Sequence, residues 1–198
     1  MSKRIFDLLL AAAALLLLSP LMLAVALAIR LDSPGPVFFR QQRVGRHGVP
    51  FNIHKFRSMR DGAAGPALTV GADPRITRVG AWLRRLRLDE LPQLIDVLQG
   101  TMSLVGPRPE LPRYVAQYPA DLRDRVLALR PGITDPSSLA FIDEAELLAR
   151  AADPEREYVQ VILPAKLARA AAYAEHASLA SDLGVLWATL RRLLGGRG

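Results

Sequence analysis

The stretch LLLAAAALLLLSPLMLAVALAI, from Leu8 to Ile29, decides the fold because it carries no charge along its whole length. As a helix it would be about 33 Å long, which matches a bilayer hydrocarbon core of about 30 Å. Ser19 and Pro20 interrupt it near its middle. Pro20 removes a backbone donor and frees the carbonyl of Leu16, and the Ser19 hydroxyl can bond a carbonyl of the preceding turn. We therefore expect a kink at this step.

Basic residues flank both ends of this stretch: Lys3, Arg4, Arg30, Arg40, Arg43 and Arg46. The positive-inside rule places both ends in the cytoplasm. Three interpretations follow. The segment is a straight span whose larger C-terminal cluster decides the orientation, a kinked re-entrant anchor that enters and leaves by one leaflet, or a signal peptide. The signal peptide fits least well, because the apolar region is too long and Asp7 stands at its start.

Composition limits the chemistry that the chain can perform. A length of 198 residues suits one domain plus a membrane segment, which we place at residues 32–198 and 1–31. There is no cysteine, and the three histidines lack zinc-site spacing, so chemistry must rest on carboxylates, hydroxyls, Lys and Arg. The net charge of +7 indicates anionic partners: nucleic acid, an acidic membrane surface or phosphorylated small molecules.

The remaining pattern predicts a mainly helical α+β domain. Residues 37–39 and 51–56 favour a short β-hairpin around a basic turn, and residues 61–75 favour a loop. Helical periodicity covers residues 76–100, where Pro92 requires a break and the second helix should start near residues 88–90. Further helices are expected at 111–129 with a break at Pro119, at 143–153, at 154–178 with a bend at Pro164, and near the C-terminus. We expect residues 103–114, with three prolines, to form a rigid extended turn.

The C-terminal helix is amphipathic and has two interpretations. Its apolar face is expected to comprise Leu183, Leu186, Trp187, Leu190 and Leu194. This face either packs against the core or lies at the membrane interface through Trp187.

The segment RRLRLDE, residues 84–90, is the strongest candidate for chemistry. Asp89 and Glu90 at a helix start are often only capping residues. Capping does not explain the surrounding arginines, among them Arg84 and Arg108, the latter held between two prolines. Rigid guanidinium groups suit phosphate oxygens, and adjacent carboxylates can bind Mg²⁺ or attack phosphorus. A covalent phosphoryl enzyme is therefore one expectation.

Several motifs in this order resemble the bacterial sugar transferases, specifically the small monotopic phosphoglycosyl transferases that act on polyprenyl phosphate. The motifs are FRQQRVG, KFRSM, DPRITRVG, LDELPQL, SLVGPRPE and RPGIT. The resemblance runs from Ser19-Pro20 to the C-terminal helix and implies transfer of a sugar 1-phosphate from a UDP-sugar to undecaprenyl phosphate, with release of UMP. It favours the re-entrant anchor, amphipathic interfacial helices, and a location at the cytoplasmic face of the bacterial inner membrane.

The resemblance also implies roles for individual residues. Asp89 matches the nucleophile that forms a covalent phosphosugar, and Glu90 matches its partner, which helps with Mg²⁺ or with the lipid phosphate. Arg84 and Arg108 match the phosphate site, and Gln93 lies four residues after Asp89 on the same side of a helix. Four further candidates for substrate binding lie in matching motifs, although a solvated basic edge near acidic lipid explains them equally well: Arg40, Arg43, Lys55 and Arg57.

The match has departures that bear on the substrate. RLRL precedes the acidic pair, and RPGIT continues as DPSSLAFIDE, a variant resembling small enzymes that handle modified UDP-sugars. The chain starts directly at the apolar segment, so we expect none of the extra N-terminal helices of longer relatives. His54 is expected to be a packed or surface residue rather than a base, and Asp73 with Arg75 a structural turn.

Two other functions are alternatives to an enzymatic one. They are a membrane-tethered basic module that binds nucleic acid or acidic lipid, and a non-catalytic scaffold. The acidic pair among the arginines counts against both, and we expect no nucleic-acid partner. Which sugar is carried and whether the chain forms a homo-oligomer stay open.

Overall fold

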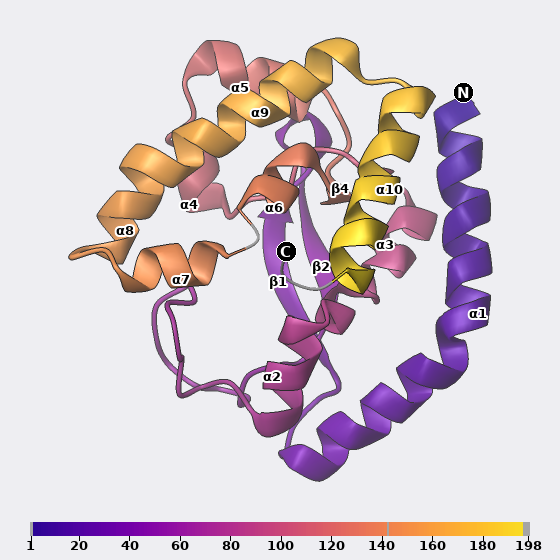
Figure 1. Cartoon of the computed structure of the whole chain (residues 1–198), viewed down its shortest axis with the longest axis vertical. Helices are drawn as coiled ribbons and strands as arrows, with labels where there is room; N and C mark the ends of the chain where they lie inside the picture. Colours follow the sequence, from indigo (N-terminus) through magenta and orange to yellow (C-terminus); the bar gives the residue numbers. More distant parts are fainter. Residues whose placement is uncertain (1, 142, 196–198) are drawn as a thin grey trace.

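The computed structural model describes residues 2–141 and 143–195. The described chain is mainly helical with two small two-stranded sheets (Figure 1). Its longest element is α1, Ser2–Asp32, an apolar helix that by length and composition could cross a membrane. Figure 1 shows α1 bending part of the way along its length, and Pro20 lies inside it. The Ser19 hydroxyl donates a 2.8 Å hydrogen bond to the Leu16 carbonyl, which confirms the predicted use of the carbonyl that Pro20 leaves free.

Both halves of α1 pack against the rest of the chain. In the first half, Ala11 is fully buried in a cluster with α3 and β3, and the buried Asp7 accepts a 2.7 Å hydrogen bond from Ser103. In the second half, Val25 and Ile29 are buried against Phe56 and Leu83. The leucines near the bend, Leu16 and Leu17, are 79% and 78% exposed. The helix therefore contacts the domain twice and leaves an apolar surface uncovered between the contacts.

The hairpin follows α1 as predicted, but it is longer. Strands β1, Phe38–Val44, and β2, Pro50–Phe56, pair antiparallel with Phe38 opposite Phe56 and Val44 opposite Pro50. The predicted first strand ended at Phe39, because the polar FRQQR sequence hid its continuation. The basic turn is confirmed as a short 3-10 segment, Arg46–Gly48.

The predicted helical stretch over residues 76–100 consists of α2, Arg78–Arg85, a 3-10 turn, Leu88–Glu90, and α3, Gln93–Gln99. The Thr77 side chain caps α2 by accepting from the amide of Gly80. Gly100, with φ of 89°, ends α3. The break at Pro92 is thus confirmed, while the second helix starts three residues later than expected.

A second sheet was not predicted. Strands β3, Ser103–Val105, and β4, Gly132–Thr134, pair in parallel, so SLV and GIT, expected as turn and helix end, lie side by side. The two backbone segments approach so closely that a Cβ on Gly132 would lie 2.1 Å from the amide nitrogen of Gly106. This approach fixes the start of the proline-rich segment that follows β3.

Short helices build the other side of the domain. They are α4, Pro112–Val115; α5, Ala120–Leu127; α6, Pro136–Ala140; α7, Glu144–Ala149; and α8, Pro154–Glu157. The break at Pro119 is confirmed, whereas α6 was not predicted. A π-helical turn, Tyr158–Ile162, joins α8 to α9, Leu163–His176. Pro164 therefore lies in the first turn of a helix, which tolerates proline.

The last helix, α10, Leu179–Leu194, begins with a Ser178–Ser181 capping box and packs near β3 and β4. Its core-facing side carries Asp182, Val185 and Leu186. Leu183, Trp187 and Leu190 are instead 49%, 64% and 51% exposed. Packing of the predicted apolar face against the core is therefore wrong for these three residues; the Leu194 side chain lies outside the described part.

Candidate active site

The two adjacent acids lie in the 3-10 turn between α2 and α3. The turn follows Arg87, whose φ of 57° and ψ of 19° place it in the left-handed region. A non-glycine residue pays roughly 1–2 kcal/mol for this conformation, a cost typical of functional sites. Pro92, not Asp89, occupies the N-cap position of α3, and no side chain caps it. The capping interpretation of Asp89 is therefore wrong, and both carboxylates turn into the domain, where they are buried.

Glu90 is held between two cations. Its Oε1 accepts from Lys55 Nζ at 2.6 Å and from Arg108 Nη2 at 2.5 Å, while Oε2 accepts from Arg108 Nη1 at 3.3 Å. Burial alone would raise the pKa of Glu90, but Arg108 and Lys55 hold this pKa well below its ordinary value. In turn Glu90 raises the pKa of Arg108. Glu90 is therefore a carboxylate at neutral pH.

Asp89 differs from its neighbour. Its Oδ1 is buried and has no hydrogen-bond partner among the described residues. Burial raises the pKa of Asp89, Lys55 opposes this shift and Glu90 adds to it. A buried carboxylate oxygen without a partner is costly, so such an atom calls for an explanation. Held beside Lys55, it is placed to bind a cation or to attack an electrophile that brings its own charge.

Arg84 lies close to the same site, as predicted. Its Nε donates to Ser58 Oγ at 2.9 Å and its Nη1 donates to Thr69 Oγ1 at 3.1 Å. Burial lowers the pKa of Arg84, and the charge of Asp89 is the largest opposing effect. Gln93 is buried at the start of α3. The structure therefore brings together Lys55, Arg84, Asp89, Glu90 and Arg108, and we call Lys55, Asp89, Glu90 and Arg108 the Asp89 cluster.

Three predicted substrate-binding residues lie elsewhere. Arg57 is buried and donates to backbone carbonyls at the end of α1 and in the following turn, including Ser33 at 2.8 Å. Arg40 contacts His54 across the hairpin and donates to the Asn52 carbonyl at 3.2 Å. Arg43 bonds the Pro109 carbonyl at 3.2 Å and lies 3.6 Å from Glu110. The structure does not place any of these three against Asp89.

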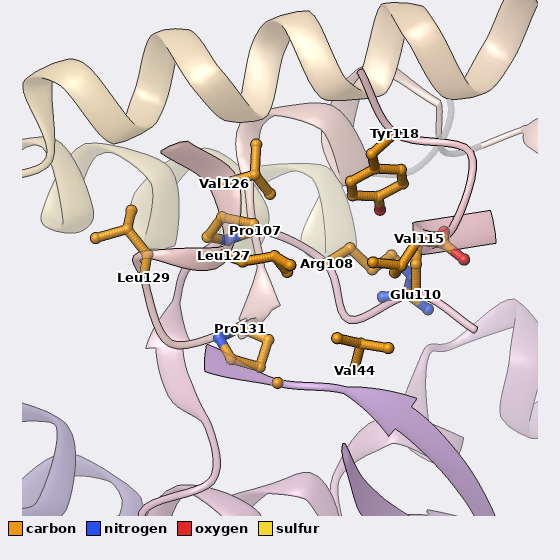
Figure 2. Close-up of a pocket in the computed structure, with 11 residues that line it drawn as sticks. Val44, Pro107, Arg108, Glu110, Val115, Tyr118, Val126, Leu127, Leu129 and Pro131 are labelled. Carbon is orange, nitrogen blue, oxygen red and sulfur yellow. The ribbon is translucent and has the colours of Figure 1, made fainter. Parts of the chain in front are cut away.

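A second charged cluster lies behind Arg108 and was missed at the sequence level. Glu110 accepts from the Tyr158 hydroxyl at 2.5 Å, and Lys166 Nζ lies 3.5 Å from the same oxygen and 2.9 Å from Glu144. With Arg43 these residues form what we call the Glu110 cluster. The sequence signal was the single lysine in the apolar stretch LPAKLARAAAY, since a buried lysine requires a partner. Figure 2 shows Arg108 and Glu110 lining one cavity, into which Tyr118 points.

Two smaller expectations are confirmed. His54 is a packed residue: its Nδ1 lies 2.6 Å from Asp96 Oδ1, and its backbone amide donates to the other oxygen at 2.9 Å. Asp73 and Arg75 form a local turn, in which the Arg75 amide and guanidinium both donate to the Asp73 carboxylate. The His54–Asp96 pair ties β2, which carries Lys55, to α3.

A long apolar helix that could cross a membrane, joined to a domain with buried carboxylates among lysine and arginine, fits the class of membrane-associated proteins with a site for anionic ligands. The sequence model described as "Bacterial sugar transferase" matches residues 1–196. The chain belongs to the bacterial sugar transferase family.

Named relatives agree with this membership. The chain is 39% identical over 200 residues to a UDP-N-acetylgalactosamine-undecaprenyl-phosphate N-acetylgalactosaminephosphotransferase of Aeromonas hydrophila, covering 99% of this chain and 44% of the relative. It is 48% identical over 136 residues to the UDP-glucose:undecaprenyl-phosphate glucose-1-phosphate transferase of Escherichia coli K12, covering 67% and 29%. It is 56% identical over 109 residues to the exopolysaccharide production protein PSS of Rhizobium leguminosarum, covering 54% of each. The chain thus spans about half, or less, of these relatives.

Proposed function

We propose that this chain transfers a sugar 1-phosphate from a UDP-sugar to undecaprenyl phosphate and releases UMP, with Asp89 as the nucleophile. The buried Oδ1 of Asp89, which has no hydrogen-bond partner in the described part of the chain and feels the charge of Lys55, carries this proposal. The names of the Aeromonas and Escherichia relatives support the donor and acceptor classes. The differing sugars in those names leave the identity of the sugar to experiment.

The reaction proceeds in two displacements. Asp89 Oδ1 attacks the β-phosphorus of the UDP-sugar, a new O–P bond forms, and the bond between that phosphorus and the bridging oxygen breaks. UMP leaves with the electron pair of that bond. A phosphate oxygen of undecaprenyl phosphate then attacks the phosphorus of the aspartyl phosphosugar, and the bond to Asp89 breaks. The products are undecaprenyl diphosphate sugar and a regenerated carboxylate.

The cations prepare the site for these charges. Arg108 lies between Pro107 and Pro109 and binds Glu90. When substrate is present, its guanidinium also neutralises phosphate oxygens. Lys55 lies against Glu90 at 2.6 Å, and its charge also acts on Asp89. Glu90 keeps both cations in place before substrate arrives, so little reorganisation is needed during the reaction.

The residues also fit Mg²⁺. The described residues contain no group of three or more metal-binding side chains, but Mg²⁺ in phosphoryl-transfer sites commonly uses one or two carboxylates together with substrate phosphates and water. Asp89 and Glu90, two adjacent buried carboxylates, would hold the ion. When bound, Mg²⁺ neutralises charge on the phosphate oxygens.

We further propose that residues 1–31 form a re-entrant anchor and residues 32–198 form the catalytic domain at the cytoplasmic face of the inner membrane. The contacts of both halves of α1 with one domain support this arrangement, since a straight span would carry one half away from it. The exposed Trp187 face of α10 is proposed to lie at the membrane interface. The chain has no cysteine, so Ser2→Cys gives a unique label site. We expect this cysteine to be labelled from the cytoplasm, whereas labelling from the periplasm would support the straight span. Pro20→Ala should shift the segment toward the straight span.

The catalytic proposal is tested with purified protein, Mg²⁺, undecaprenyl phosphate and a panel of UDP-sugars, with UMP release as the measurement. With the donor alone, intact-mass spectrometry should detect one added phosphosugar on the wild type and none on Asp89→Asn. Asp124→Asn is the matched control, because it makes the same change at an exposed aspartate on α5. Absence of UMP from every sugar, or full activity of Asp89→Asn, would overturn the proposal and leave a scaffold or basic binding module.

A further inference from the structure

Glu110 lies two residues after Arg108 and fixes the segment that carries it. The Glu110 carbonyl accepts from the Val44 amide at 2.9 Å, and one carboxylate oxygen accepts from the Leu111 amide at 3.2 Å. Arg43 donates to the Pro109 carbonyl at 3.2 Å. The segment is therefore attached on both sides of Glu110, by backbone groups and by the Glu110 carboxylate.

The carboxylate of Glu110 is itself surrounded by groups from three elements. Arg43 approaches from β1, Tyr158 from the π-helical turn, and Lys166 from α9. Arg108 adds a further positive charge from the same segment, and Lys166 is shared with Glu144. Burial would raise the pKa of Glu110, but Lys166 and Arg43 lower it, so the group is ionised. Each of its two oxygens has a partner among the described residues.

The π-helical turn supplies the most specific contact. π-helical turns are rare and occur frequently at functional sites, because they cost stability. Here the turn begins at Tyr158, whose hydroxyl reaches the buried Glu110 oxygen at 2.5 Å. The neighbouring Tyr114 ring packs against Tyr158 at a tilt of 54°, with 4.7 Å between ring centroids, but its hydroxyl donates to Glu155 at 2.9 Å. The two tyrosines share one environment and differ in the acid that they bond.

We propose that Glu110 is a positioning residue for the reaction, held by Tyr158 and Lys166, and that it aims Arg108 at Glu90 and at the phosphate. The effect of Glu110 on the reaction rests on the proposed function, whereas its effect on the position of Arg108 does not. Glu110 does not touch the reacting atoms. Its role is to fix the direction of the Arg108 guanidinium, because small displacements of an orienting group reduce the rate strongly.

The test compares Tyr158→Phe with Tyr114→Phe, since each removes one hydroxyl from the same pair of rings. In Tyr158→Phe we expect kcat to fall about tenfold to a hundredfold with KM for the UDP-sugar within about twofold. In Tyr114→Phe we expect both parameters to stay within about twofold of the wild type. Equal kcat losses in the two variants, or no loss in Tyr158→Phe, would overturn the positioning role.

Amide hydrogen exchange of the peptide covering residues 103–111 gives a readout independent of turnover. Exchange at Leu111, whose amide donates to the Glu110 carboxylate, should accelerate in Tyr158→Phe and not in Tyr114→Phe. Unchanged exchange in Tyr158→Phe would overturn the proposal. If the wild type releases no UMP while the exchange difference is present, the proposed function fails and the attachment of this segment through Glu110 stands.

A second variant pair tests the charge of Glu110. Glu110→Gln leaves Lys166 and Arg43 without their shared anion, and kcat should fall by at least as much as in Tyr158→Phe. Adding Lys166→Met removes one of the two cations that Glu110 neutralised, while the partly exposed Glu144 loses its partner. Part of the thermal midpoint should return, but not the wild-type kcat. Recovery of full kcat in the double variant would show that charge balance alone, rather than positioning by Glu110, sets the rate.

Discussion

The Asp89 cluster includes Arg108, and the Glu110 cluster lies next to that arginine. Both clusters combine carboxylates with lysine and arginine, yet their carboxylates are hydrogen-bonded to different degrees. In the Glu110 cluster both carboxylate oxygens of Glu110 have partners. In the Asp89 cluster Glu90 is similarly clamped, but Asp89 Oδ1 has no hydrogen-bond partner among the described residues. Among the described residues the Glu110 carboxylate is fully bonded, although Arg43 Nε has no hydrogen-bond partner, whereas the Asp89 carboxylate has an open oxygen that our proposal assigns to a substrate. The distinction between the two carboxylates depends on one oxygen atom of Asp89, and four experiments test it.

The largest expected effect separates activity from stability at Asp89. Asp89→Asn should lower the rate of UMP release by at least about a thousandfold, since an amide cannot replace the attacking carboxylate. The same change removes a buried charge with an unpartnered oxygen, so the free energy of unfolding should stay equal or rise. Turnover and thermal denaturation measured on one preparation check both parts. A marked loss of stability would mean that Asp89, like Glu90 and Glu110, stabilises the fold.

Glu90→Gln should damage both properties, because it leaves Lys55 and Arg108 facing an uncharged group. Breaking a buried pair from one side costs about 3 kcal/mol, or roughly 6–12 °C in thermal midpoint for a chain of this size. Lys55→Met in the Glu90→Gln background removes one of the two uncompensated cations and should recover part of that loss. A Glu90→Gln variant as stable as the wild type would contradict a stabilising role for the Glu90 pairs with Lys55 and Arg108.

Acid should act on the two kinds of carboxylate with opposite sign. Glu90 and Glu110 have pKa values below the ordinary 4.5, so their stabilisation is complete above pH 4.5 and is lost as the pH falls through their lower folded values. The pKa of Asp89 is raised, so its contribution improves as the pH falls and it becomes protonated. The stability advantage of Asp89→Asn over the wild type should therefore shrink on acidification. Denaturation of both proteins measured from pH 7 to pH 4 checks this. A stability advantage that grows on acidification would mean that the pKa of Asp89 is lowered, not raised.

The smallest effect concerns the backbone before the acids. Arg87 has a φ of 57°, where a Cβ is unfavourable and glycine is not. Arg87→Gly should therefore be more stable than Arg87→Ala by about 1 kcal/mol, although both lose the same guanidinium. Chemical denaturation of the two variants provides the measurement. Equal stability would indicate that the turn relaxes and that the strain does not hold the acids in place.

Much of this arrangement could be predicted from local sequence. The apolar run, its Ser19-Pro20 bend, the hairpin and the break at Pro92 follow from hydropathy and proline chemistry, and Asp89, Glu90, Lys55, Arg84 and Arg108 do lie together. The parallel pairing of SLV with GIT depends on contact between distant segments, and three-residue strands leave no periodicity to detect. Arg43 and Arg57 resembled ligand-binding residues because a sequence pattern does not reveal whether an arginine meets a carboxylate, a carbonyl or solvent.

The contact between the first and last helices has a consequence for how the protein is made. Lys3 binds Asp182 across 179 residues of sequence, and Asp182 also accepts from Tyr173. At about 5–20 residues per second, the ribosome delivers Asp182 roughly 10–40 s after Lys3. During that interval α1 lacks this partner, so its docking against α10 follows the synthesis of all the residues between them. Truncation before α10 should therefore yield a nascent chain that engages the insertion machinery or chaperones for longer than the full chain does.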